Sequence, residues 1–175
     1  KWIEYYKIKF KSKTYTPLSS NRKLVLMTRF DLGYLGSYNK YKQSPFGSFY
    51  MGGDGTTGYS SAYTYETIAL RGYENGSLGA SNIYERVAME LRYPLMMETS
   101  TTIYALAFVE AGNLWDNAKS WEPFRLKRSA GVGVRIFLPM VGLMGIDWAY
   151  GFDKANRTAT GISGSQFHFV IGQEF

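Results

Sequence analysis

The residues of this chain that could take part in chemistry are few and widely spaced. His168 is the only histidine, and a histidine paired with a serine could serve a hydrolase. No matched nucleophile motif accompanies it, so we expect an ordinary polar residue on the inner face of a strand. The Gly-Gly-Asp-Gly run at 52–55 could imitate a phosphate-binding loop, but no Gly-Lys-Ser/Thr follows, which favours a turn. The absence of cysteine excludes disulfides and thiolate metal sites.

Two acidic residues are spaced so that a cation is expected between them. Glu90 and Glu110 lie in two alternating segments that a short connection joins. If the turn is centred near Ser100, the two carboxylates lie directly opposite each other, where like charges destabilise a sheet. An arginine between them would replace repulsion with charge-assisted hydrogen bonds. From spacing alone, a simpler interpretation stays open: both glutamates are hydrated, and Arg71 is a solvated loop residue.

Alternating patterns predict the strands that must position these residues. The clearest begins at Tyr5, where lysines at every odd position from Lys7 to Lys13 alternate with mostly apolar residues. A period of two is typical of a strand with one wet and one apolar face. Six further segments follow the same period, at 23–34, 86–93, 103–111, 129–136, 144–150 and 167–175. The sequence thus predicts seven strands and no convincing helix.

The connections between these strands alternate between short and long. Short ones are expected at 17–22, 97–101 and 139–142, and long ones at 36–82, 113–126 and 153–164. Outer-membrane barrels have tight periplasmic turns and extended outer loops. No apolar stretch approaches the roughly 20 residues of a membrane helix, so any membrane span must consist of strands. The prediction is an all-β, antiparallel transmembrane barrel in the outer membrane, with its long loops outside and its C-terminus periplasmic.

The two faces of the strands follow from the same alternation. Apolar residues expected to face lipid are Leu24, Leu26, Phe30, Val87, Met89, Leu91, Ile146, Trp148, Phe167 and Phe169. Charged residues expected to face inward are Lys7, Lys9, Lys11, Arg29, Arg86, Glu90 and Arg92. Because seven is an odd number and an open sheet edge is not tolerated in lipid, further strands are expected before Lys1.

The net charge of +6 raises the question of nucleic-acid binding. The lysines alternate with apolar residues and form no single basic patch, so we expect no nucleic-acid partner.

Four landmarks, in order, resemble the BamA family, the central subunits of the machinery that assembles outer-membrane β-barrels. The run at 49–53 (Phe-Tyr-Met-Gly-Gly) resembles the beginning of the family's sixth outer loop. The run at 70–73 (Leu-Arg-Gly-Tyr) resembles the Val-Arg-Gly-Phe motif at the tip of that loop. The run at 129–133, with Pro139 after it, resembles the antepenultimate strand and its turn, and 146–150 resembles the final hairpin.

The resemblance implies that residues 1–175 are the last seven strands of a sixteen-stranded barrel, preceded by upstream strands and periplasmic POTRA domains. The long loop at 36–82 would fold back into the barrel, where its arginine meets acidic residues of the inner wall. The residues of this loop anchor would be Arg71, Gly72, Tyr73, Glu90 and Glu110. The cysteine pair that some members of the family have in this loop is absent, and residues 55–67 lengthen the approach to the arginine.

The same resemblance implies a function without catalysis or cofactor. The complete protein would receive unfolded outer-membrane proteins, with accessory subunits and outer-membrane lipid as further partners. It would template their strands at a seam between its own first and last strands. The seam residues of the last strand would be Phe167, Phe169, Ile171, Gly172 and Phe175, with Gly172 a candidate for the bend that a glycine gives this strand in the family. The alternatives are a polypeptide-secreting pore of the same superfamily, a porin, and a hydrolase that uses His168.

Overall fold

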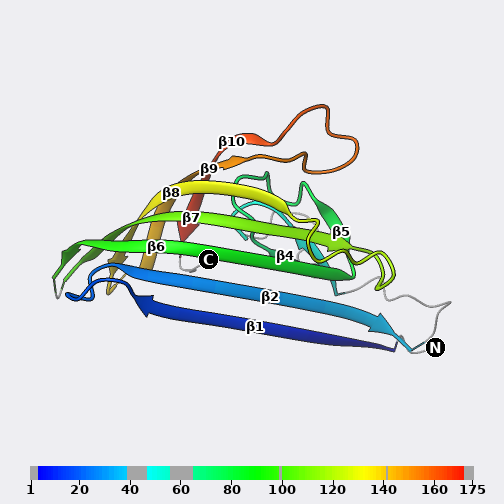
Figure 1. Cartoon of the computed structure of the whole chain (residues 1–175), viewed down its shortest axis with the longest axis horizontal. Coiled ribbons are helices and arrows are strands. Elements are labelled where there is room, and N and C mark those ends of the chain that lie inside the picture. The colour runs from blue at the N-terminus through cyan, green and yellow to red at the C-terminus, as the bar shows by residue number, and fades with distance from the viewer. Residues whose placement is uncertain (1–3, 39–46, 56–64, 99, 141, 172–175) are drawn as a thin grey trace.

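The computed structural model describes residues 4–38, 47–55, 65–98, 100–140 and 142–171. Seven long strands of this part form one sheet in which every neighbouring pair is antiparallel (Figure 1). They are β1 (Tyr5–Pro17), β2 (Val25–Ser37), β6 (Ile83–Met97), β7 (Thr102–Trp115), β8 (Lys127–Leu138), β9 (Gly142–Gly151) and β10 (Gly164–Ile171). The seven predicted strands are therefore confirmed, and most are longer than the alternating segments that predicted them. No helix of the described residues is long and apolar enough to cross a membrane.

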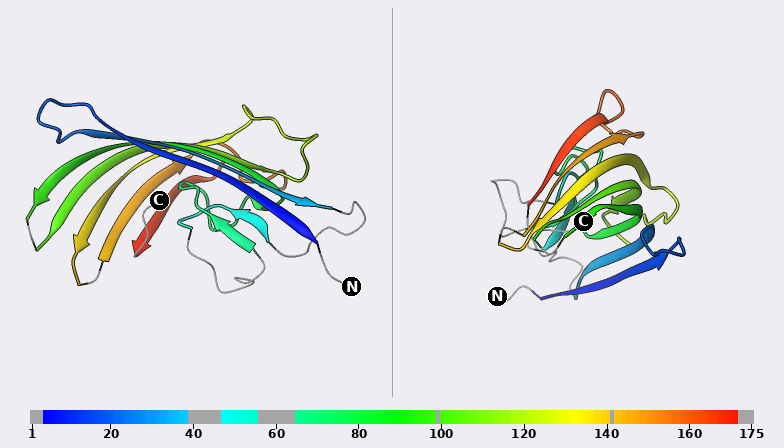
Figure 2. Two further views of the ribbon diagram at one scale, coloured as in Figure 1. Left: turned by 90° about the horizontal axis from the view of Figure 1, so that it is seen from below. Right: turned by 90° about the vertical axis from the view of Figure 1, so that its left-hand side faces the viewer.

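The sheet is strongly curved, and the described parts of the long connection between β2 and β6, residues 47–55 and 65–82, lie inside the curve (Figure 2). The strand order is β1-β2-β6-β7-β8-β9-β10, so β1 and β10 are the two edges and the described residues do not close a barrel. Within the predicted loop at 36–82, three short strands make a second sheet: β3 (Ser48–Met51), β4 (Tyr65–Ile68) and β5 (Gly79–Ser81). β3 pairs in parallel with β4 and antiparallel with β5.

A small hydrophobic core fixes this inner sheet to the wall. Phe49 and Met51 of β3 are fully buried, together with Leu70 and Tyr73 of the following segment. The wall contributes Tyr84 of β6, whose ring meets that of Phe49 edge to face with centroids 4.5 Å apart. The long loop thus carries its own apolar face, and burying that face is what holds the loop inside the curve.

The predicted faces of β6 and β10 agree with the burial of their side chains, whereas β1 is largely exposed on both faces and its Lys9 and Lys11 are not buried. On β6, Arg86 and Glu90 are 2% and 1% exposed, whereas Met89 between them is 44% exposed. On β10, Phe167 and Phe169 are exposed and His168 is buried. Glu90 and His168 face the concave side of the sheet, where Arg71 and Gly72 of the loop contact them.

The predicted register of β6 and β7 is wrong by two residues. Glu90 lies opposite Phe108, and Glu110 lies opposite Ala88, so the two carboxylates are diagonal neighbours. The turn is closed by hydrogen bonds between Glu98 and Thr101, slightly earlier than a turn centred on Ser100. A bulge between Pro94 and Met96 then shifts the pairing by one more residue.

Candidate functional site

The loop tip at 70–73 lies against the inner wall of the curved sheet. Gly53 and Leu70 exchange both backbone hydrogen bonds at 3.1 Å, which fixes the chain immediately before the arginine. Arg71 itself has no exposed surface, and Tyr73 has none either. The hydroxyl of Tyr73 donates to the carbonyl of Arg128 at 2.8 Å, and burial raises the pKa of this phenol to about 12. The tip is therefore a buried, hydrogen-bonded segment.

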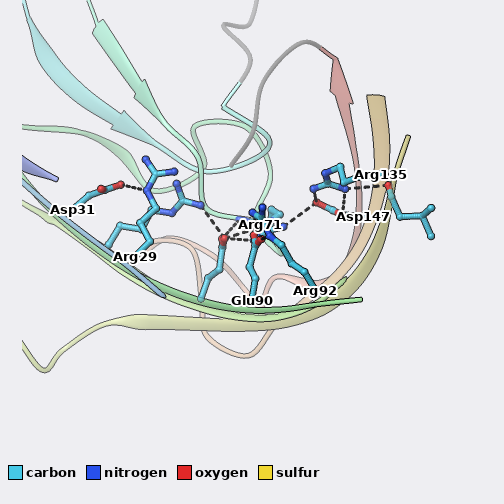
Figure 3. Close-up of polar contacts among 10 residues, drawn as sticks. Arg29, Asp31, Arg71, Glu90, Arg92, Arg135 and Asp147 are labelled. Carbon is cyan, nitrogen blue, oxygen red and sulfur yellow. Dashed lines mark hydrogen bonds and ion pairs between the residues drawn. The ribbon is translucent and has the colours of Figure 1, made fainter. Parts of the chain in front are cut away.

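Arg71 binds three carboxylates that come from three different strands (Figure 3). Its Nε donates to Glu110 of β7 at 3.0 Å, and its Nη2 donates to both Glu110 and Glu90 of β6. Its Nη1 donates to Asp147 of β9 at 3.1 Å. The backbone amide of Arg71 also donates to Glu110, at 3.0 Å. A planar guanidinium with five donors can satisfy such a set, whereas a point charge cannot.

The register of β6 and β7 explains how one side chain reaches both Glu90 and Glu110. Phe108 lies opposite Glu90 and two residues before Glu110, on the same inner face. The guanidinium carbon of Arg71 lies 3.5 Å from the centre of the Phe108 ring. Stacking on this ring adds a cation–π attraction and places the fork of donors between the two diagonal carboxylates. Burial alone would lower the pKa of Arg71, but Glu110, Glu90 and Asp147 raise it, so the guanidinium stays charged.

Three further arginines complete the network around these carboxylates. Arg86 donates to Glu110 at 2.8 Å, Arg92 donates to Glu90 at 2.7 Å, and Arg135 donates to both oxygens of Asp147 at 2.6 Å. Each of the three carboxylates therefore has two cationic partners. Buried charges are tolerated only when paired in this way, and breaking such a network is costly. The structure brings Arg71, Glu90 and Glu110 together as the resemblance implied, and it adds residues that the sequence analysis did not assign to the anchor: Asp147, Arg86, Arg92 and Arg135.

Glycines in the wall make room for the charged side chains. A Cβ added to Gly133, which pairs with Asp147, would overlap an oxygen of that carboxylate. A Cβ at Gly145, which pairs with Arg135, would lie 2.6 Å from the arginine Cδ. These pairs of a glycine opposite a charged residue were visible in the alternation and could have pointed to a buried ionic site.

The family comparison covers the whole chain. The model of the Omp85 superfamily domain matches residues 1–175. The chain belongs to the Omp85 superfamily. The outer membrane protein assembly factor BamA of Neisseria meningitidis serogroup B is 28% identical to this Omp85 chain over 129 residues. The match covers 65% of the chain and 14% of that protein.

A solved structure shares the fold of this Omp85 chain. The crystal structure of BamA from Haemophilus ducreyi lacking POTRA domains 1-3 matches with a TM-score of 0.62 at 21% identity. The match covers 95% of the chain and 35% of the solved one, so the chain spans a minor part of both relatives. The predicted resemblance to the BamA family is confirmed, and the antiparallel sheet corresponds to part of a BamA barrel.

Three of the five residues predicted to line a seam lie on β10, the last described strand of this Omp85 chain. Phe167, Phe169 and Ile171 are 66%, 61% and 72% exposed on the outer face of β10. Gly172 and Phe175 lie outside the described residues, and so does the predicted bend at Gly172. Among the described strands, β10 is hydrogen-bonded to β9 alone.

The other edge of this Omp85 sheet also contacts the loop. Lys7 and Lys9 of β1 each donate to Glu66 of β4 at 3.1 Å. Burial raises the pKa of Glu66, but the hydrogen bonds from the two lysines outweigh it and hold this pKa below its ordinary value. A carboxylate whose pKa is lower in the folded state than in the unfolded state stabilises the fold at pH values above its unfolded-state pKa. This stabilisation is lost as the pH falls through the folded-state pKa.

We therefore expect acidification below about pH 4 to loosen the inner sheet from β1 in the Omp85 domain. The effect is small, about 1 kcal/mol or less, because the lysines and Glu66 are partly exposed. The measurement is protease sensitivity of the loop against pH in the full-length protein. Glu66→Gln is the matched control, and its loop should be looser at neutral pH with a flatter pH profile. An unchanged profile in this variant would assign the acid response to other carboxylates.

Proposed function

We propose that the complete protein assembles other β-barrel proteins in the bacterial outer membrane, without catalysis by residues of this chain. The similarity to an outer membrane protein assembly factor supports this proposal, since it extends over 65% of the chain. The observation that carries it within the structure is the fully buried arginine tip, ion-paired to three strands of the inner wall. A segment fixed in this way occupies the interior of the curved sheet, which suits an assembly protein better than a permanently open porin.

The seam for incoming strands would include β10. An edge strand presents a row of backbone donors and acceptors, and an extended segment of a substrate can add to it by backbone hydrogen bonding. The exposed side chains of Phe167, Phe169 and Ile171 suit contact with lipid beside such a seam. The partners would be unfolded outer-membrane proteins, accessory assembly subunits and outer-membrane lipid. The long loops would lie outside the cell and the C-terminus in the periplasm.

The test uses the full-length protein with its accessory subunits in lipid vesicles. An unfolded reporter barrel is added, and its folding is followed by heat-modifiable mobility on gels. We expect folding at least about tenfold faster than in empty vesicles, equivalent to about 1.4 kcal/mol of barrier. Release of a soluble polypeptide into the vesicle lumen, without reporter folding, would indicate a secretion pore instead. Steady single-channel conductance alone would indicate a porin, and lipid hydrolysis that His168→Ala removes would indicate an enzyme.

A further inference from the structure

The last strand contacts the loop tip as well as β9. The amide of Gly72 donates a hydrogen bond to Nε2 of His168 at 2.9 Å, and this contact is buried. Two residues along β10, Val170 is 2% exposed and packs against Ala69 of the loop. β10 is thus held by backbone pairing with β9 at one edge, and by Ala69 and the loop tip at 70–73 on its inner face.

Two consecutive peptide groups of the tip bind two different strands. The amide of Arg71 donates to Glu110 of β7, and the next amide, that of Gly72, donates to His168 of β10. His168 lies opposite Asp147 in the pairing of β10 with β9, and Asp147 binds the Arg71 guanidinium. The tip therefore joins β7, β9 and β10 over the length of two residues.

The hydrogen bond between Gly72 and His168 sets requirements on both its donor and its acceptor. A buried backbone amide that loses its acceptor incurs the full cost of its desolvation, so Gly72 favours the position of β10 in which His168 is present. Nε2 accepts only when the imidazole is neutral with its proton on Nδ1, and no other histidine exists in the chain. His168 is thus a specific partner of the tip.

We infer that His168, together with Val170, is a positioning residue that couples the last strand to the arginine tip. β10 leaves its place beside the wall only when the Gly72–His168 and Ala69–Val170 contacts break. The anchor and the strand that forms the seam then act as one unit, in which a firmly seated tip holds the seam strand in place. This coupling rests on the proposed function for its consequence in assembly, but the contact itself can be tested without it.

The first experiment measures the coupling without any assembly assay. Backbone hydrogen exchange of the Gly72 amide and of β10 is measured in the full-length protein in detergent or nanodiscs. We expect His168→Leu, which removes the acceptor, to speed exchange at both places by about tenfold. His168→Gln retains an acceptor and should restore most of the protection. Gln166→Ala is the matched control, because Gln166 faces the same side of β10 but contacts Ser163. Equal exchange in the His168→Leu variant and the wild type would overturn the inference.

The second experiment tests the consequence for assembly and does not depend on a destabilising variant. Since residues 1–175 contain no cysteine, an engineered pair within this part of the full-length protein can be studied in its oxidised and reduced forms. Ala69→Cys with Val170→Cys ties the loop to the last strand, and the reduced form of the same variant is the matched control. We expect the oxidised 69–170 pair to slow reporter assembly by about tenfold or more relative to the reduced form of the same variant, with full recovery on reduction.

The outcomes separate the inference from the proposed function. If neither the wild type nor any variant assembles the reporter, the proposed function fails, while the exchange data still decide whether the tip and β10 are coupled. If the wild type assembles the reporter and the oxidised 69–170 pair does so equally fast, the coupling has no part in seam opening and the inference is overturned.

Discussion

Replacing Arg71 with alanine is expected to free the loop tip from the inner wall and to remove most of the proposed assembly activity of the full-length protein. Glu90, Glu110 and Asp147 would keep one arginine each but lose the cation that they share. Removing one partner of a buried ion pair costs about 3–5 kcal/mol, because the remaining charges stay desolvated. The loss should appear as rapid proteolysis of the loop and as slow folding of a reporter barrel.

The matched variants make this expectation specific to the guanidinium. Arg71→Lys should rescue only partly, because an ammonium cannot contact Glu90, Glu110 and Asp147 with the geometry of a planar fork. Glu90→Gln and Glu110→Gln should each weaken the anchor. Their effects should be non-additive with Arg71→Ala, since residues of one network share the same interactions. Strict additivity in the double-mutant cycle would mean that the arginine and the carboxylates act independently.

The strands and their faces could be predicted because the period of two needs no knowledge of neighbouring strands. The alternation of Met89 and Glu90 alone places one outside and the other inside. The three short strands of the loop were missed because segments of three or four residues are too short to show a period. β3 and β4 also pair in parallel across a long connection, which local patterns cannot reveal.

The ionic site was predicted only in part because it depends on register. A hairpin with a turn centred on Ser100 would have placed Glu90 opposite Glu110. The turn between Glu98 and Thr101 and the bulge between Pro94 and Met96 each shift the pairing by one residue, so the two carboxylates lie at diagonal positions. That shift puts Phe108 beneath the arginine, a contact that no local pattern indicates. Asp147 and Arg135 were placed in the correct strands, but their part in the anchor requires β9 to lie two strands away from β7 across the curve. Curvature brings them together, and curvature is set by all the strands at once.

Gly72→Ala is expected to dislodge the tip almost as strongly as the loss of Arg71. Gly72 has a φ of +87°, a region that costs an L-residue about 1–2 kcal/mol. An added Cβ would also lie 2.7 Å from the Cβ of Ser129 and 3.1 Å from the amide nitrogen of Gly151. The contacted atom of Gly151 belongs to the backbone of β9, which cannot shift without disturbing the strand pairing. Overpacking of this kind adds about 1–3 kcal/mol.

Two other glycines separate these contributions. Gly79 has a φ of +89° with nothing within 4 Å of an added Cβ, so Gly79→Ala should show the conformational cost alone. Gly161 also has nothing within 4 Å and no positive φ, so Gly161→Ala should be close to neutral. The measurement is the free energy of releasing the loop, from hydrogen exchange at 70–73 in the full-length protein. A Gly72→Ala effect no larger than that of Gly79→Ala would mean that the tip is not pressed against β9. A clear excess would instead give the contribution of the close approach between Gly72 and Gly151, which is what allows Arg71 to reach all three carboxylates.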